Sequence, residues 1–241
     1  MPATSSVMPR TQREQPSLDT KVQPAQQRAS ETYERLLAAA AATLEDVGIE
    51  RLSTNLVAER AGVTPPALYR YFPNKYALLS ELGKRLMHRQ NVCVERWMSE
   101  EVLAGGTPAL EKALTGLLLD TYEVTRQTEG GVWIMRALRA VPALQEVRLG
   151  SHAEVTAAQA AMLAKALPEV PAAELQLASR IVVELIYASV ELLFDEPQDP
   201  EAVARVVAGM LASHLDRTRP AAAQAAAQSV AKPAAKRSRK R

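Results

Sequence analysis

The chain has 241 residues, of which 47% are hydrophobic and only 4% are aromatic. This length allows one or two domains, and the alanine-rich apolar content favours packed helices over sheets. The apolar runs fall short of the roughly 20 residues that a membrane span needs, and no early segment reads as a signal peptide. A single cysteine, Cys93, excludes an intramolecular disulfide and fits a reducing cytoplasm. We therefore expect a cytoplasmic protein that makes no contact with a membrane.

The small net charge of +2 conceals three regions of different sign. Residues 51–96 hold eight Lys/Arg against three Asp/Glu, a net of +5, whereas residues 97–216 hold eight against seventeen, a net of −9. Residues 217–241 hold eight basic residues and no acidic one, a net of +8. Two basic regions around an acidic one indicate a polyanionic partner for part of the chain, although charge runs are more often solvated faces.

Both ends of the chain have the composition of disordered tails. Residues 1–27 are rich in Pro, Gln, Ser and Thr and show no apolar period, and residues 219–241 are rich in Ala and Gln and then in Lys and Arg. Between the tails, the breaks and the apolar spacing predict a first domain over residues 28–75 and a second helical domain over residues 76–218.

Helical spacing of apolar residues recurs along the chain, and no stretch shows the sustained alternation typical of strands. We therefore predict an all-α protein with about nine helices. Apart from two short helices between residues 52 and 73, they are expected over residues 30–47, 75–103, 108–128, 132–141, 143–167, 172–194 and 200–217. Ser30 is expected to cap the first helix, and Gly48 to end it in a left-handed conformation.

Residues 53–63 predict a short helix followed by a sharp turn. Ser53 precedes the helical stretch 54–60, where its hydroxyl can accept a hydrogen bond from an amide of the first turn. Gly62 can adopt a positive φ angle, and Val63 can fill the angle between two helices.

Residues 64–75 predict a second short helix and the start of a long one. Thr64 can cap a helix that opens with Pro65 and Pro66, because the missing proline amides would have no intrahelical partner there. Asn74 can cap the next helix, which begins at Lys75. A cation is unfavourable at the positive end of a helix unless a phosphate also binds there. A solvent-facing lysine that tolerates this penalty is the alternative interpretation of Lys75.

The segment from Ser53 to Lys75, read as a whole, resembles the signature of the TetR family of bacterial transcriptional regulators. In that family a capped short helix ends in Ala-Gly-Val, here residues 61–63, and a recognition helix carries Leu-Tyr-x-His/Tyr-Phe, here residues 68–72. A Pro-Ser/Asn-Lys junction, here residues 73–75, then leads into the fourth helix. The resemblance takes in the preceding helix as well, and in the second domain it is limited to the number and length of helices.

This resemblance implies that residues 28–75 are a helix-turn-helix DNA-binding domain. By position, the residues that would face base edges are Thr64, Pro65, Pro66 and Ala67, and those that would contact phosphates are Tyr69, Tyr71 and Lys75. The DNA backbone would also be approached by Ser53, Thr54 and Asn55, of which Asn55 could reach a base, and Arg70 could contact either a base or a phosphate. Because two prolines leave the base-facing tip with few donors, we expect phosphate contacts and DNA shape to contribute much of the recognition. Packing is the alternative role of both tyrosines.

For the second domain, the resemblance implies a homodimer formed through the last two helices and an effector cavity among the central helices. Dimer contacts are expected from Ile181, Leu185, Ser189, Leu192, Val203, Val207, Met210 and Leu211. The cavity is expected to be lined by Met87, Cys93, Trp97, Leu118, Tyr122, Trp133, Met135, Met162 and Tyr187. Core packing is the alternative role of both sets.

The function that follows from the resemblance is a repressor that a small, largely apolar ligand releases from a palindromic operator. Activation in place of repression stays open, because the helix-turn-helix does not encode the sign. We expect no enzyme, metal or cofactor, because the three histidines are scattered and no phosphate-binding glycine loop or nucleophile elbow occurs. The basic residues 232–241 leave one alternative, a nucleoid-associated or DNA-bridging architectural protein.

Overall fold

The computed structural model describes residues 15–21 and 27–218, and within these ranges every regular element is a helix, so the all-α prediction is confirmed. The elements are α1 (Gln27–Arg51), α2 (Thr54–Arg60), α3 (Pro65–Tyr69), α4 (Lys75–Trp97), α5 (Glu100–Ala104), α6 (Gly106–Gln127), α7 (Gly131–Ala140), the 3-10 turn η1 (Pro142–Leu144), α8 (Gln145–Ala166), α9 (Ala172–Asp195) and α10 (Pro200–Thr218). The tail predictions for residues 1–14, 22–26 and 219–241 lie outside the described residues.

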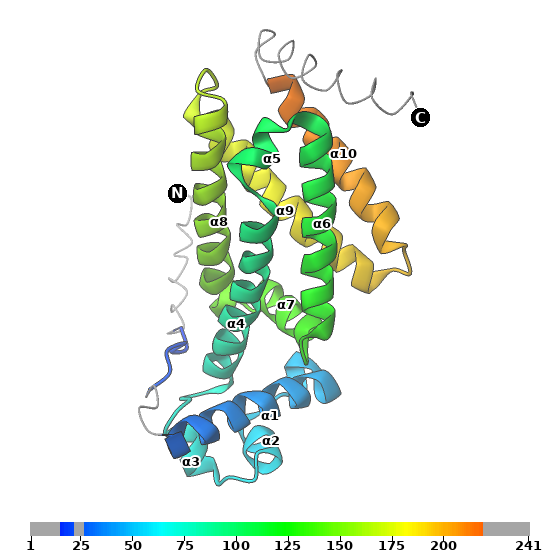
Figure 1. Cartoon of the computed structure of the whole chain (residues 1–241). Helices are drawn as coiled ribbons and strands as arrows, with labels where there is room; N and C mark the ends of the chain where they lie inside the picture. The colour runs from blue at the N-terminus through cyan, green and yellow to red at the C-terminus, as the bar shows by residue number, and fades with distance from the viewer. Residues whose placement is uncertain (1–14, 22–26, 219–241) are drawn as a thin grey trace, which may run out of the picture.

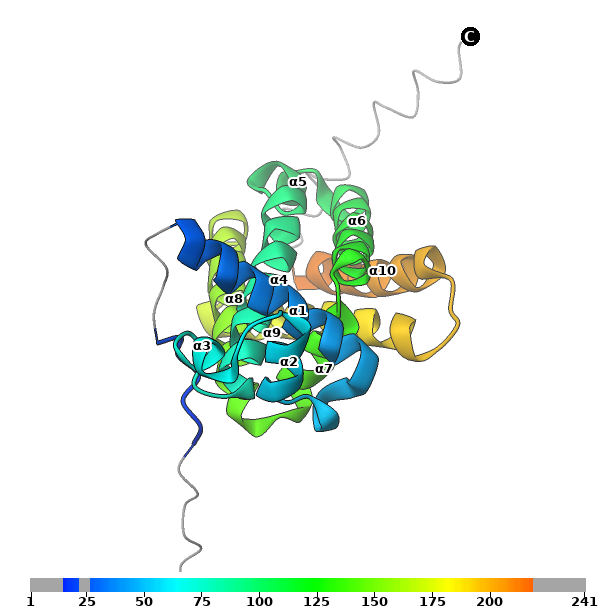
Figure 2. The same ribbon diagram turned by 90° about the horizontal axis from the view of Figure 1, so that it is seen from below.

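Helices α1, α2 and α3 form a small unit at one end of the molecule, and α4 leads from it into a bundle of long helices (Figure 1). Within the bundle, α10 packs along α6 and α8 packs along α9. Figure 2 looks onto the end that α1, α2 and α3 form, which covers the end of the bundle. Among the described residues, no helix is both long enough and apolar enough to cross a membrane.

One hydrophobic cluster joins the small unit to the bundle. Leu36 of α1, Phe72 after α3 and Leu138 of α7 are all buried in it. A second cluster lies farther along the bundle, where α6, α9 and α10 contribute most of the side chains. Because apolar burial is the main favourable term in folding, the shared first cluster holds the small unit against the bundle.

Several helix boundaries differ from the prediction. α1 begins at Gln27, so Ser30 lies inside the helix and the predicted cap at Ser30 is wrong. The long helix predicted over residues 75–103 is interrupted, because Met98 has extended backbone angles and the Ser99 hydroxyl accepts from the Val102 amide (3.3 Å), which starts α5. Gly48 adopts a positive φ of 73°, but its ψ of 177° is extended and helical residues resume as far as Arg51, so the predicted left-handed stop is a kink inside α1.

Residues 15–21 lie in the segment predicted to be disordered, but they pack against the small unit. Leu18 contacts the first hydrophobic cluster. The Lys21 amide donates to the Tyr71 carbonyl (2.8 Å), and the Asn74 side-chain amide donates to the Ser17 carbonyl (3.0 Å). The prediction of disorder therefore does not hold for this stretch, because one leucine and two hydrogen bonds anchor it.

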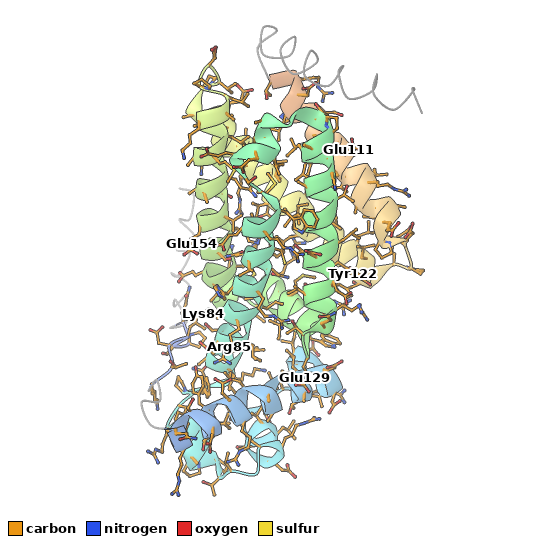
Figure 3. The ribbon with its side chains drawn as sticks, in the orientation of Figure 1. Lys84, Arg85, Glu111, Tyr122, Glu129 and Glu154 are labelled. Atoms are coloured by element: carbon orange, nitrogen blue, oxygen red, sulfur yellow. The ribbon has the colours of Figure 1, made fainter. Side chains whose placement is uncertain are left out.

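Polar contacts also tie α1 to the bundle. Arg85 of α4 forms a bidentate ion pair with Glu34 of α1 at 2.6 and 2.8 Å, and Figure 3 shows Arg85 where α4 approaches α1. At the other end of α1, the Glu45 carboxylate accepts from the Gly130 amide (3.1 Å) in the turn between α6 and α7. The turn is packed closely, since a methyl group added to Gly130 would lie 2.8 Å from the Ala41 carbonyl oxygen.

Candidate nucleic-acid interface

The start of α2 and the whole of α3 form the outer face of the small unit. The predicted cap is confirmed, because the Ser53 hydroxyl accepts from the Leu56 amide (3.3 Å). Thr54 shares a hydrogen bond with the Tyr69 hydroxyl (2.9 Å), which links the first turn of α2 to the end of α3. Asn55 is exposed beside them. These residues therefore form a surface held in place by its own hydrogen bonds.

The tip of α3 opens with two prolines, as predicted. Thr64 is the N-cap residue and has extended backbone angles, but its hydroxyl makes no cap hydrogen bond. The reason is that Pro66 has no amide and the Ala67 amide already donates to the Thr64 carbonyl (2.9 Å). The Thr64 hydroxyl is exposed, so it remains available to a partner outside the chain.

The two tyrosines of the recognition segment occupy different environments. Tyr69 is 40% exposed, whereas Tyr71 is 8% exposed and its ring lies edge-on to Tyr33, with ring centroids 6.0 Å apart. Arg70 lies between them in the sequence, is exposed, and has no ion-pair partner among the described residues. Tyr69 and Arg70 are therefore better placed for a nucleic acid than Tyr71, which serves mainly in packing.

Lys75 begins α4 beside this face, as predicted. The Asn74 side-chain oxygen accepts from the Ala77 amide (3.0 Å), which confirms the cap. The Lys75 ammonium group donates to the Ile49 carbonyl (3.3 Å), and one carbonyl does not neutralise its charge. The ammonium group therefore stays beside the positive end of the helix, where an anion would be favoured.

The outer faces of α9 and α10 carry an apolar surface, which we call the α9–α10 face. Its exposed large side chains are Leu177, Ile181, Leu185, Leu192, Val206 and Met210. Four predicted dimer residues, Ile181, Leu185, Leu192 and Met210, are among them; Val203 and Val207 are half-buried, and Ser189 and Leu211 are buried within the chain. Neighbouring exposed apolar side chains of this kind are a candidate interaction surface.

The nine residues predicted to line an effector cavity are not brought together. Of these, only Tyr187 lines the central cavity, which lies between α4, α6, α8 and α9. Met87, Cys93 and Met162 each line a different surface groove. The remaining five pack elsewhere: Leu118 and Met135 are buried in the two clusters, the Trp97 indole donates to Asp120, Tyr122 lies against Phe194, and Trp133 lies near Gly48.

Two buried glutamines of the central cavity are missing from the sequence prediction. Gln90 of α4 is 1% exposed and Gln159 of α8 is 7% exposed. In the sequence, each of them could have been noticed as a polar residue on the apolar face of a helix. The prediction considered Met and aromatic residues at such positions instead. Gln90 donates to the Thr125 hydroxyl (2.8 Å) and accepts from the Tyr187 hydroxyl (2.9 Å), so it connects three helices.

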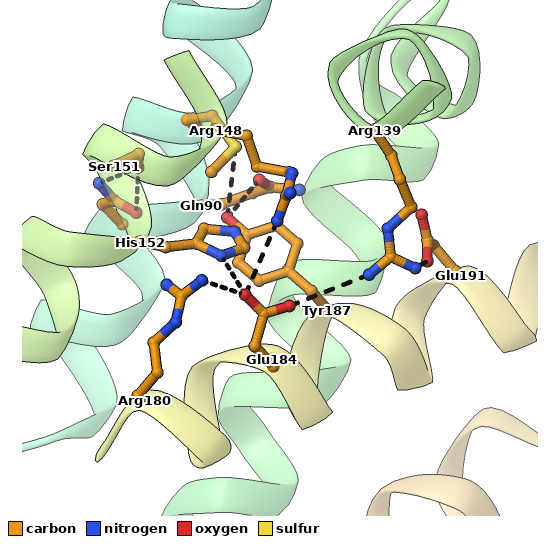
Figure 4. A network of polar contacts seen from close by, with 11 residues as sticks. Gln90, Arg139, Arg148, Ser151, His152, Arg180, Glu184, Tyr187 and Glu191 are labelled. Carbon is orange, nitrogen blue, oxygen red and sulfur yellow. Dashed lines mark hydrogen bonds and ion pairs between the residues drawn. The ribbon is translucent and has the colours of Figure 1, made fainter. Parts of the chain in front are cut away.

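A network of charged side chains surrounds Tyr187 on one side (Figure 4). Its centre is Glu184, which accepts from His152 Nδ1 (3.0 Å) and pairs with Arg180 and with Arg148. Burial lowers the pKa of His152, an effect that the Glu184 contact opposes. Burial would raise the pKa of Glu184, but His152 and the guanidinium groups hold it below its ordinary value. The charged groups of this network are thus paired with one another.

The described residues contain no group of three or more His, Cys, Asp or Glu side chains that could hold a metal ion. Cys93 is a free, buried cysteine, and burial raises the pKa of its thiol. A raised pKa keeps the sulfur protonated at neutral pH, which disfavours nucleophilic chemistry at this position.

Comparison with known proteins places the first part of the chain in a family. Residues 36–82 match the model of bacterial regulatory proteins of the tetR family. The tetracycline repressor protein class C of Escherichia coli is 46% identical over 54 residues, which cover 22% of this chain and 25% of that protein. The transcriptional repressor KstR of Mycolicibacterium smegmatis is 38% identical over 79 residues, or 32% of this chain and 36% of that protein.

Solved structures extend the likeness to the second domain as a likeness of fold. A TetR-family regulator from Syntrophomonas wolfei superposes with a TM-score of 0.61 at 13% identity, covering 77% of this chain and 95% of that one. The sequence matches span less than half of the curated relatives, so they concern the region around the helix-turn-helix. The resemblance inferred from residues 53–75 is confirmed, and the relatives do not favour the architectural alternative.

Proposed function

Since the helix-turn-helix domain of this chain is of the TetR family, we propose that the protein is a transcriptional repressor that binds a palindromic operator as a homodimer and leaves it when a small ligand binds. The observation that carries the proposal is the outer face of α2 and α3, which presents Thr64, Tyr69 and Arg70. Among the described residues, Arg70 has no ion-pair partner for its charge. A nucleic acid supplies both the groove and the phosphates that these groups fit.

Recognition on this proposal divides between two kinds of contact. Lys75, Tyr69 and the amides at the start of α4 supply phosphate contacts, which fix the register of the protein on the duplex. Thr64 and Arg70 supply hydrogen bonds to base edges, while Pro65 and Pro66 offer apolar contact to thymine methyl groups. The rigid proline tip suits A·T-rich positions in the half-site, since thymine alone presents a methyl group there.

The α9–α10 face supports the dimer. Its exposed apolar side chains would be buried against a second copy, which is the arrangement that a two-fold operator requires. A groove lies between the two helices and could accommodate side chains of the second copy. Its lining includes Leu185, Met210 and His214. Two recognition helices at fixed spacing then read two half-sites.

The test is selection of duplexes from fragmented genomic DNA by the purified protein, followed by fluorescence-anisotropy titration of the selected duplex at several salt concentrations. Lys75→Ala should weaken binding to selected and scrambled duplexes alike and lower the salt slope by about one unit. Lys112→Ala removes the same charge from an exposed position on α6 and should leave both unchanged.

Thr64→Val tests base reading. It should reduce the preference for the selected over the scrambled duplex by about five- to tenfold, the value of one hydrogen bond of about 1–1.5 kcal/mol. Failure to select any duplex, or a selected duplex that binds no better than its scrambled form, would overturn the proposed function.

A further inference from the structure

We propose that residues 15–21, which we call the N-terminal strap, are a further part of the DNA interface and hold Lys21 against a phosphate of the duplex. This inference rests on the proposed function, because it adds a contact to the interface of the same repressor. The strap lies outside residues 36–82, which match the family model, so that match gives it no role.

Two hydrogen bonds hold the strap against the junction between α3 and α4. The Lys21 amide donates to the Tyr71 carbonyl (2.8 Å), and the Asn74 side-chain amide donates to the Ser17 carbonyl (3.0 Å). Tyr71 follows the end of the recognition helix α3, and Asn74 is the N-cap residue of α4. The strap therefore follows the short junction that leads from the recognition helix to Lys75.

Two side chains of the strap fix it as well. Leu18 packs against the first hydrophobic cluster, and the side chain of Thr20 shares a hydrogen bond with that of Tyr33 in α1. Ordering a segment costs conformational entropy, and a segment that is already held at several points does not lose this entropy again when it binds a partner. A charge on the strap is therefore preorganised for binding.

Lys21 is the cation that this anchoring places. Its backbone amide is held by the Tyr71 carbonyl, but its side chain is exposed and has no ion-pair partner among the described residues. Asp19 is the one acidic residue of the strap, and it forms no ion pair with Lys21. The ammonium group is thus free to bind a phosphate, which lysine contacts as a point charge.

The junction beside the strap carries cations and no counter-charge of its own. Residues 61–80 contain Arg70 and Lys75 and no Asp or Glu. Arg70 is exposed and has no ion-pair partner in the described part of the chain, and the Lys75 ammonium group donates to the neutral Ile49 carbonyl (3.3 Å). Lys21 adds a third cation at the same junction. A DNA backbone, with one negative charge per phosphate, is the partner that fits such a group.

The position of the strap favours phosphates over bases. Figure 1 shows the strap in blue beside the start of α4, and Figure 2 shows it next to α3, at the edge of the end that α1, α2 and α3 form. On the proposed function, the tip of α3 enters the groove and reads bases, so a residue at the edge meets the sugar-phosphate backbone. A phosphate contact carries no sequence information, and Lys21 should therefore strengthen binding to every duplex.

The experiment is fluorescence-anisotropy titration of the full chain at several salt concentrations, on a selected duplex and on a mixed-sequence duplex. Lys21→Ala should weaken binding to both about fivefold near 0.15 M salt and lower the salt slope by about 0.9, as expected for one phosphate contact. Lys21→Arg keeps the charge and should bind within about twofold of the unmodified chain. Lys112→Ala removes a charge from an exposed position on α6 and should change neither quantity. Unchanged binding by Lys21→Ala, or an equal loss for Lys112→Ala, would overturn the proposal.

A double-mutant cycle tests whether the strap positions the charge. Leu18→Ala removes the apolar anchor without changing the charge, so binding should weaken about two- to threefold, the cost of ordering one lysine side chain again. The double variant with Lys21→Ala should bind as Lys21→Ala alone does, because an absent ammonium group cannot be misplaced. Additive losses, or no loss for Leu18→Ala, would show that the anchor does not position Lys21.

The two duplexes separate this proposal from the proposed function. A phosphate contact does not depend on sequence, so the effect of Lys21→Ala can be measured on the mixed-sequence duplex even when no duplex is selected. Failure to select a duplex contradicts operator recognition and leaves the strap contact standing. Equal binding by Lys21→Ala and the unmodified chain contradicts the strap contact alone, and absence of binding to either duplex contradicts both.

Discussion

Replacement of Gly130 by alanine tests how much the close contact between α1 and the turn joining α6 to α7 contributes to stability. Gly130 has φ 65°, and a Cβ atom there would lie 2.8 Å from the carbonyl oxygen of Ala41 in α1. The positive φ alone costs an alanine roughly 1–2 kcal/mol. The contact adds a cost of about 1–3 kcal/mol, because a backbone oxygen cannot move without moving its helix.

Gly62→Ala is the matched control. Gly62 has a similar φ of 63°, but a Cβ atom there meets nothing within 4 Å, so it carries the conformational cost alone. Urea-induced unfolding of both variants at one fixed protein concentration gives the two losses of stability, since the stability of a dimer depends on concentration. Gly130→Ala should be the more destabilised by at least about 1 kcal/mol. Equal losses would show that the close contact with α1 does not contribute.

Three further predictions use other parts of the molecule. Burial lowers the pKa of His152 below 6.5 in the folded chain, so on acidification the unfolded chain protonates this imidazole first, and stability should fall as the pH drops through 6.5. In urea titrations His152→Gln should flatten this pH dependence, and His88→Gln should not. Arg85→Met breaks the bidentate pair with Glu34 at a part-exposed site, so it should cost about 1 kcal/mol or less by the same assay, and a loss of several kcal/mol would contradict this. Met210→Glu places a charge on the α9–α10 face and should give a monomer by sedimentation, whereas a stable dimer would contradict the proposed interface.

The sequence was most informative where local chemistry decides the structure. Ser53 and Asn74 cap their helices, Gly62 takes a positive φ angle, and Pro65 begins α3, all as predicted. Each of these features depends on a few neighbouring residues, so a short segment is enough to recognise it. The same segment carries the family resemblance, which explains why the DNA-binding unit could be predicted without a structure.

The lining of the central cavity could not be predicted from the sequence, because it depends on how four helices are rotated about their axes. Met and aromatic residues were expected to line this cavity, but most of them pack in the core or line surface grooves, whereas Gln159 and Gln90 line the cavity. A buried glutamine is exceptional on an apolar face, yet only the packing shows whether it meets a protein partner or a cavity. Similarly, the apolar period continues across Ser99, but in the structure Met98 is extended and the Ser99 hydroxyl caps α5.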